Sequence, residues 1–186
     1  MNRLIKEYDN YALSISMTTR KPRAGEENGK SYFFVTHEEF EQKISQDGLL
    51  EYASYCDNYY GTPKAYVEEQ LQAGKDVILE IEVQGALQIK EKYPNALLLF
   101  VTPPSAEILR SRLESRGTET QEVINKRMQT ACKESEFMKQ YDFIVVNDDL
   151  DICVRDTHEM IRAAHYASSR SEAFIQLLKE GLNNLS

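Results

Sequence analysis

A chain of 186 residues with 41% apolar and 28% charged side chains has an ordinary globular composition and enough residues for a buried core. Its formal net charge of −8 argues against general affinity for nucleic acid, because that affinity needs a basic face. No apolar run approaches the roughly 18 residues of a membrane span, and the first ten residues lack the apolar core of a signal peptide. The three cysteines have no CxxC spacing and suggest neither a disulfide framework nor a zinc site. We therefore expect a cytoplasmic protein without nucleic-acid or membrane partners.

The first third of the chain predicts short strands joined by turns. Alternating apolar residues favour strands at 11–17, 31–35, 49–55 and 57–61. Thr36 and Glu39 form a capping box that should begin a helix. A second helix should run between Pro63 and Gly74, because proline is favoured where helices begin and glycine where they end. Since the strands here are short and clustered, we interpret residues 16–62, approximately, as an inserted lobe.

The rest of the chain alternates strands and helices. Three apolar runs, at 76–83, 96–102 and 142–148, have the pattern of strands buried on both faces. Helices are expected from about residue 86, over 105–116 and 122–141, and twice more towards the C-terminus. This alternation predicts an α/β fold, with a parallel sheet and helices on both of its faces.

The stretch SISMTTRKPRAGEENGKSYFF, residues 14–34, holds two arginines in an otherwise acidic chain. Arg20 and Arg23 lie three apart on a proline-stiffened loop, where two guanidinium groups can converge on one phosphate. The hydroxyls of Tyr32 and Tyr60 could complete such a site. Solvated arginines and core tyrosines explain the local pattern equally well, because most arginines are exposed.

A second clue is Glu51, which stands between apolar neighbours in a predicted strand. A buried carboxylate needs a hydrogen-bond donor to offset its desolvation. Guanine offers two adjacent donors, its N1–H and 2-amino groups, and the hydroxyls of Thr62 and Ser16 suit its O6. Adenine would leave these groups unpaired, so the site could discriminate against adenine by a factor of about 10⁴. A guanine nucleotide with one phosphate satisfies the whole set.

Five segments resemble the guanylate kinase family in order and spacing: SISMTTRKPRAGEENGKSYFF, LLEYASYCDNYYGT, VILEIEVQGALQI, RLESRGTET and VVND. The resemblance covers about residues 11–157. It implies a P-loop-kinase-like parallel core with a GMP-binding lobe and a helical lid near 110–130, all in one domain over 1–186. The implied reaction is ATP + GMP to ADP + GDP, in purine nucleotide metabolism. It implies Mg²⁺ as cofactor, for which we identify no protein ligand.

By position, the resemblance assigns roles to the GMP side of the site. Guanine recognition falls to Ser16, Glu51, Thr62 and Glu82. The phosphate of GMP falls to Arg20, Arg23, Tyr32 and Tyr60. Glu80 joins the GMP-binding residues; like Glu82, it replaces an aspartate of some relatives and lies at a strand end, where open α/β sheets bind ligands. The alternative for Glu80 is a carboxylate that caps the next helix.

The resemblance also assigns the ATP side. It implies that Arg112, Arg116 and Arg127 are lid arginines that neutralise ATP phosphates during transfer. Asn147 matches an asparagine that contacts adenine. Without the resemblance, Arg112 and Arg116 would be interpreted as a solvated helix face, and Asn147 as a turn residue.

Guanylate kinases begin with a strand and a GxxGxGK[ST] loop that holds ATP phosphates, and no such motif occurs in the 186 residues. Aligned on SISMTTR, Met1 falls just after that loop. Either Met1 is an internal methionine of a longer reading frame, or the protein is a variant without ATP chemistry. We favour the first explanation because the other nucleotide-binding positions are present. The chain as given is expected to bind GMP, with its catalytic activity in question.

The missing motif keeps a second functional class open. A non-catalytic guanylate kinase-like interaction module that binds phosphorylated peptides would need no ATP loop. Glu51 and Thr62 argue against it, because a peptide phosphate requires neither residue. A structural remnant is the third alternative, and cooperative unfolding tests it.

Near the C-terminus, Phe174, Leu177 and Leu178 form an apolar helical stripe. Such a stripe usually packs on its own domain. A homodimer contact is the alternative.

Overall fold

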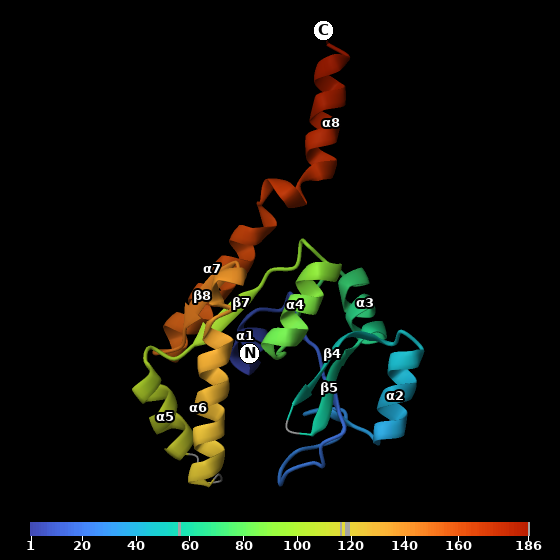
Figure 1. Ribbon diagram of the computed structural model, residues 1–186. Helices are drawn as coiled ribbons and strands as arrows, with labels where there is room; N and C mark the ends of the chain where they lie inside the picture. The colour runs from blue at the N-terminus through green and yellow to red at the C-terminus, as the bar shows by residue number, and fades with distance from the viewer. Residues whose placement is uncertain (56, 116, 118–119, 186) are drawn as a thin grey trace. The chain divides into compact units, whose positions relative to one another are not determined.

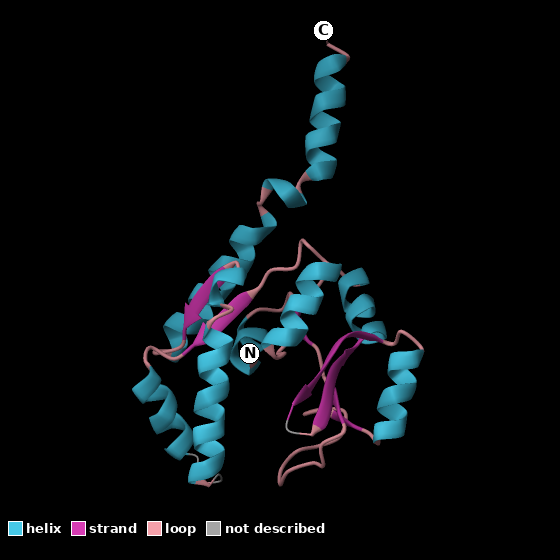
Figure 2. Cartoon of the chain, in the orientation of Figure 1, coloured by secondary structure: helices cyan, strands magenta, loops and turns pink. Residues whose placement is uncertain are grey.

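The computed structural model describes residues 1–186 except 56, 116, 118, 119 and 186 (Figure 1). The lid candidate Arg116 therefore lies outside the described residues. The chain divides into two compact units, Met1–Pro94 and Asn95–Ser186. Both units mix helices and strands (Figure 2). No helix in the described part of the chain is long and apolar enough to cross a membrane.

The described residues of the first unit form two sheets. Its strands are β1 (Tyr11–Leu13), β2 (Met17–Thr18), β3 (Phe33–Phe34), β4 (Leu49–Tyr55), β5 (Asn58–Pro63) and β6 (Asp76–Ile78). Strands β1 and β6 pair in parallel, and the larger sheet has the order β3-β2-β5-β4. In that sheet β2 is parallel to β3, while β5 is antiparallel to both of its neighbours. Its helices are α1 (Asn2–Glu7), α2 (His37–Ser45), α3 (Lys64–Gln72) and α4 (Val83–Lys92).

Several strand predictions in this unit are wrong in extent; the expected strand at 31–35, for example, forms only over Phe33–Phe34. The strand residues within 11–17 belong to two strands in different sheets, β1 and β2. The last hydrogen bond between the β1 segment and β6 runs from the Ser14 amide to the Ile78 carbonyl at 2.9 Å, and the chain then leaves this sheet. The apolar run from residue 76 forms a strand only to Ile78, and α4 begins at Val83 rather than near residue 86. A short apolar run does not distinguish the end of a strand from the start of a helix.

The larger sheet rests on a small apolar core. Met17, Phe40 and Leu49 are buried together, and the ring of Phe40 stacks on Tyr59 with centroids 5.2 Å apart. Phe40 belongs to α2, whose predicted capping box at Thr36 is confirmed. The cap begins the helix where Phe40 can reach the sheet. This packing fixes the strands that carry the candidate GMP-binding residues.

The second unit is built on another parallel strand pair. Its strands are β7 (Leu99–Thr102) and β8 (Phe143–Val146), and its helices are α5 (Ala106–Ser115), α6 (Gln121–Ser135), α7 (Leu150–His165) and α8 (Glu172–Asn183). The predicted cap is confirmed, since the Ser105 hydroxyl accepts from the Ile108 amide at 3.3 Å. The prediction of a single helix over 122–141 is wrong, because α6 ends at Ser135 and a 3₁₀ turn over Met138–Gln140 follows. The parallel pairs of both units agree with the predicted α/β class.

The prediction of strands buried on both faces is also wrong. In β8 only Val145 is fully buried, while Phe143, Ile144 and Val146 are exposed, and β6 is half-buried throughout. Helix α7 packs against β8. Apolar character along the whole strand therefore overstates its burial. The C-terminal stripe differs from its expectation as well, since Phe174 is 65% exposed on α8.

Candidate nucleotide site

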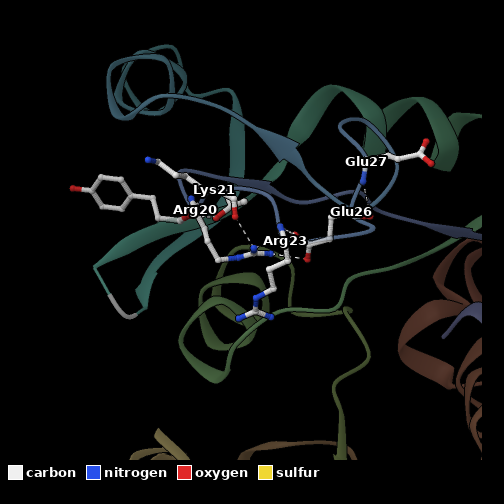
Figure 3. A network of polar contacts seen from close by, with 8 residues as sticks. Arg20, Lys21, Arg23, Glu26 and Glu27 are labelled. Atoms are coloured by element: carbon white, nitrogen blue, oxygen red, sulfur yellow. Dashed lines mark hydrogen bonds and ion pairs between the residues drawn. The ribbon is translucent and has the colours of Figure 1, made fainter. Parts of the chain in front are cut away.

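Arg20 is the centre of a polar network just after β2 (Figure 3). Its Nη1 and Nη2 donate to the two carboxylate oxygens of Glu26 at 3.0 and 2.8 Å, and Nη1 also donates to the Lys21 carbonyl at 2.7 Å. The backbone amide of Arg23 donates to Glu26 Oε2 at 2.7 Å. Three protein N–H groups therefore converge on one carboxylate. A bidentate carboxylate and a phosphate present similar oxygen pairs to a guanidinium group.

The charges of this network stabilise each other. Hydrogen bonding to Glu26 raises the pKa of Arg20, with burial acting in the opposite direction. Hydrogen bonding to Arg20, followed by the Arg23 amide, lowers the pKa of Glu26. Both groups are therefore charged at neutral pH. The guanidinium of Arg23 points away from Glu26 (Figure 3), so Arg23 is hydrogen-bonded to this carboxylate through its backbone, while its charge also lowers the pKa of Glu26.

Aromatic rings complete the surroundings of Arg20. Its Cζ lies 5.4 Å from the centroid of Tyr32 and 5.7 Å from that of Phe34, within cation–π range. Tyr32 and Tyr60 meet edge to face at 6.2 Å, and Tyr60 also raises the pKa of Arg20. Burial raises the pKa of Tyr32, with smaller contributions from Tyr60 and Glu80. The structure thus brings together Arg20, Tyr32 and Tyr60.

Strand pairing explains how these residues meet. Thr18 on β2 lies opposite Tyr60 on β5, and Arg20 follows two residues after Thr18. The buried Thr18 hydroxyl donates to the Tyr59 carbonyl at 2.8 Å and accepts from the Arg20 amide at 3.2 Å. This bond fixes the turn that directs the chain from β2 into the arginine loop.

The second part of the site is a buried carboxylate. Glu51 on β4 is 3% exposed, and its Oε1 accepts from the Thr62 hydroxyl at 2.6 Å; Thr62, on β5, is fully buried. Burial raises the pKa of Glu51, while the Thr62 bond and the charge of Lys92 oppose this shift and Glu82 adds to it. Glu51 and Thr62 are therefore in direct contact, and the charge of Glu82 acts on Glu51.

Tyr60 and Thr62 link the two parts. They lie two residues apart on β5, so their side chains project from the same face of the sheet. The spacing along the strand is roughly 7 Å. Arg20 lies beside the first residue and Glu51 beside the second. One sheet face thus carries a cation at one end and a carboxylate acceptor at the other.

The remaining candidates of the first unit lie at its loops. Ser16 is half-buried between β1 and β2, and its carbonyl accepts from the Phe33 amide at 2.9 Å. No hydrogen bond in the described part of the chain joins Ser16 to the Glu51–Thr62 pair. The helix-cap alternative for Glu80 is wrong: Glu82 is the N-cap of α4, without a side-chain cap bond. The side chain of Glu80 is 60% exposed.

The ATP-side candidates lie in the second unit. Arg112 on α5 donates from Nη1 to the Asn147 carbonyl at 2.7 Å, so it is not a purely solvated residue. The Asn147 amide donates to the Thr102 carbonyl at 2.8 Å, which extends the β7–β8 pairing. Arg127 is half-buried on α6. Two of the four candidates, Arg112 and Asn147, are therefore in contact.

Sequence reasoning missed several residues that contact the candidates. Glu26 and Phe34 contact Arg20, and neither was assigned a role, although both lie in the same quoted stretch. Gly85 and Gln88 of α4 lie against Glu51 and Tyr52. The only sequence signal for them was the short segment VQGALQ after the β6 strand.

The described residues contain no group of three or more His, Cys, Asp or Glu side chains arranged to hold a metal ion. Magnesium in phosphoryl-transfer enzymes is bound partly through substrate phosphates.

Parallel strand pairs, helices and a separate four-stranded sheet that carries Arg20, Tyr60, Glu51 and Thr62 or lies beside them define a mixed α/β protein. Comparison with known proteins agrees and is more specific. The family model "Guanylate kinase" matches residues 1–164. Guanylate kinase of Latilactobacillus sakei is 52% identical over 159 residues, covering 86% of this chain and 78% of the relative. Guanylate kinase of Desulfitobacterium hafniense is 51% identical over 151 residues, covering 81% and 76%.

A solved structure shows the same relationship. The crystal structure of guanylate kinase from Anaplasma phagocytophilum has a TM-score of 0.77 and 31% sequence identity to this chain, covering 91% of this chain and 82% of the other. The chain belongs to the guanylate kinase family. Its fold is that of a P-loop kinase, and the interaction-module alternative is not favoured.

Proposed function

We propose that the protein transfers a phosphoryl group from ATP to GMP, forming ADP and GDP, and that the β3-β2-β5-β4 sheet binds GMP. The observation that carries this proposal is the shared face of Tyr60 and Thr62, with Arg20 beside one and Glu51 beside the other. The lobe at about 16–62 is then the GMP-binding lobe of one domain over 1–186.

Glu51 and Thr62 read the base. The carboxylate of Glu51 accepts the N1–H and 2-amino groups of guanine, while Thr62, Ser16 and Glu82 complete the contacts around it. Support comes from the burial of Glu51, since a carboxylate without water gains most from two fixed donors. Adenine presents an acceptor at N1 to this carboxylate and is rejected.

Arg20 and Arg23 hold the phosphate of GMP, with the hydroxyls of Tyr32 and Tyr60. The fork of Arg20 already binds the paired oxygens of Glu26, which supports its suitability for a phosphate. Glu80, whose charge contributes to the raised pKa of Tyr32, is assigned to the same group. A phosphate oxygen of GMP is the nucleophile in the reaction.

Residues of the second unit bind ATP. The lid at about 110–130 supplies Arg112, Arg116 and Arg127 to neutralise charge on the transferring group, and Asn147 contacts adenine. A new bond forms between the GMP phosphate oxygen and the γ-phosphorus, while the bond from that phosphorus to the β-bridging oxygen breaks. Mg²⁺ bound to ATP would supply charge that shields the phosphates. The protein contributes position and positive charge.

A coupled assay tests the proposal. ADP production by this chain from ATP and Mg²⁺ should depend on GMP, and AMP at the same concentration should not replace it. Equal rates with GMP and AMP would contradict the proposal. Calorimetry on the same preparation separates binding from turnover, and GMP binding without turnover would restrict the function of this chain to GMP recognition.

We also propose that the protein acts in the cytoplasm, where both nucleotides occur. The cysteines support this, since Cys132 and Cys153 are unpaired and a reducing compartment keeps them so.

A second copy of this chain is the proposed partner of α8. Phe174 and Leu177 on this helix, and Leu185 just after it, are more than half exposed. In an antiparallel pair that buries the apolar face of Phe174, Leu177 and Leu178, each Phe174 would lie beside the partner's Leu185. This match of apolar side chains supports self-association.

Analytical ultracentrifugation tests the dimer. Leu177→Glu should shift the chain to monomer, because it places a carboxylate in the apolar contact. Leu71→Glu is the matched control, since Leu71 is a 55% exposed leucine on α3. A wild-type chain that stays monomeric at every concentration would contradict the proposal.

A further inference from the structure

Gly85, in the first turn of α4, lies against the carboxylate of Glu51. A Cβ atom built at Gly85 would be 2.3 Å from Glu51 Oε2 and 2.9 Å from Cδ. Real Cβ contacts are longer than 3.0 Å, so a side chain here would displace the carboxylate. Gly85 does not have the positive φ that favours glycine. The requirement for glycine at this position is therefore one of space.

The helix is held against β4 by two further side chains. The Gln88 amide donates from Nε2 to the Tyr52 carbonyl at 3.0 Å and accepts from the Tyr52 amide at 3.4 Å. Lys92 Nζ donates to the Leu50 carbonyl at 2.8 Å. Because β4 is the edge strand of its sheet, these bonds satisfy backbone groups that no neighbouring strand pairs.

The spacing of these three residues places them on one face of the helix. Gly85, Gln88 and Lys92 are three and four residues apart, the separation of neighbours on an α-helix surface. The bonds to Leu50 and Tyr52 fix the backbone on both sides of Glu51. Thr62 then holds one carboxylate oxygen, and the second lies over Gly85.

We propose that this face of α4 (Gly85, Gln88 and Lys92) is a positioning element that sets selectivity for the guanine 2-amino group. The inference rests on the proposed function, in which Glu51 binds guanine. The backbone is fixed on both sides of Glu51, and Oε1 is held by the Thr62 hydroxyl, so Oε2 is restricted to its position over Gly85. A small rotation of the carboxylate would keep one acceptor for N1–H and lose the alignment with the 2-amino group.

Calorimetry with GMP, IMP and AMP tests this inference on the chain and on Gly85→Ala. IMP keeps N1–H and lacks the 2-amino group, so the ratio of GMP to IMP affinity reports that one contact. Gly85→Ala should lower GMP affinity by about ten- to a hundredfold and bring the GMP/IMP ratio close to one. The control is Gly181→Ala in α8, where a Cβ meets nothing within 4 Å; it should leave both affinities unchanged.

The affinity ratio separates positioning from general damage. A purely structural defect would weaken GMP and IMP equally and leave their ratio at its wild-type value, which would overturn the inference. Gln88→Leu is the second variant, because leucine suits a helix and removes both bonds to Tyr52 without a clash. It should lower the ratio severalfold, and it decides the matter if Gly85→Ala does not fold.

Failure of the proposed function gives a different result. If the wild-type chain binds GMP and AMP equally, Glu51 does not read guanine and the inference falls with the proposed function. If the wild-type chain prefers GMP, and both variants keep its GMP/IMP ratio, only the role of α4 is wrong.

Discussion

Thr62→Val removes the hydroxyl that holds Glu51 while keeping nearly the same side-chain volume. The bond is 2.6 Å long, and its residues are 0% and 3% exposed, so water does not replace the lost donor. A hydrogen bond to a charged group contributes about 1.5–3 kcal/mol. We expect the free energy of unfolding to fall by about that amount at neutral pH, which lowers Tm by roughly 3–12 °C for a chain of this size.

The pH dependence of this loss identifies its origin. Burial already raises the pKa of Glu51, and the Thr62 bond opposes that rise. Without the hydroxyl, the folded variant keeps its proton to a higher pH than the folded wild type. The destabilisation should therefore be smallest at low pH, where both folded forms are protonated. It should grow as pH rises through the wild-type pKa and become constant above the variant's pKa.

Urea denaturation of both proteins between about pH 4 and pH 8, a range around the ordinary Glu pKa, measures this difference. Thr18→Val is the matched control, because Thr18 is equally buried and its hydroxyl bonds only uncharged backbone groups. Its cost should not change with pH. A cost for Thr62→Val that is also constant with pH, or below about 0.5 kcal/mol, would refute the charged hydrogen bond.

The other predictions concern the arginine loop and the lobe. Arg20→Lys keeps the positive charge but loses the planar guanidinium that can donate two hydrogen bonds to one phosphate. The affinity for GMP, measured by calorimetry, should fall about tenfold or more, while the affinity for guanosine stays unchanged. Equal losses of affinity for both ligands would contradict a phosphate role. Arg20 lowers the pKa of Glu26, so the wild type should be more stable than Glu26→Gln. This stability difference should be fully present above the unfolded Glu pKa and should disappear as pH falls through the folded pKa. A difference that stays constant with pH in thermal melts would argue against this interaction. Thr36→Ala removes the capping box of α2 and should lower the free energy of unfolding, measured by urea denaturation, by about 1 kcal/mol. It should leave the affinity for GMP unchanged. A changed affinity would show that α2 also orders the site.

Local signals in the sequence predicted much of the fold. Capping chemistry placed the start of α2 at Thr36, because that interaction involves residues only three apart. Strand ends were predicted less well, because β1 and β6 end where their pairing with each other ends. No residue within either apolar segment indicates that end point. The same limit explains the overstated burial of Phe143 and Ile144, because hydrophobicity does not reveal which faces are covered.

The candidate site shows the same division. Glu51 was recognisable because a carboxylate in an apolar strand needs a partner, and the structure supplies Thr62 from the neighbouring strand. Glu26 was not recognisable, since a glutamate in a polar loop is usually solvated, yet it binds Arg20 with both oxygens. Gly85 was hidden for another reason: its importance lies in the atoms it lacks, which only the packing of α4 on β4 reveals.

The central claim is that Glu51 reads guanine, and calorimetric titration of the chain and of Glu51→Gln with GMP and AMP tests it most directly. The account predicts that wild type prefers GMP by about 10³-fold or more, and that Glu51→Gln loses most of this preference because its amide replaces one acceptor with a donor. Equal affinity of the wild-type chain for GMP and AMP, or an unchanged preference in Glu51→Gln, would contradict the account.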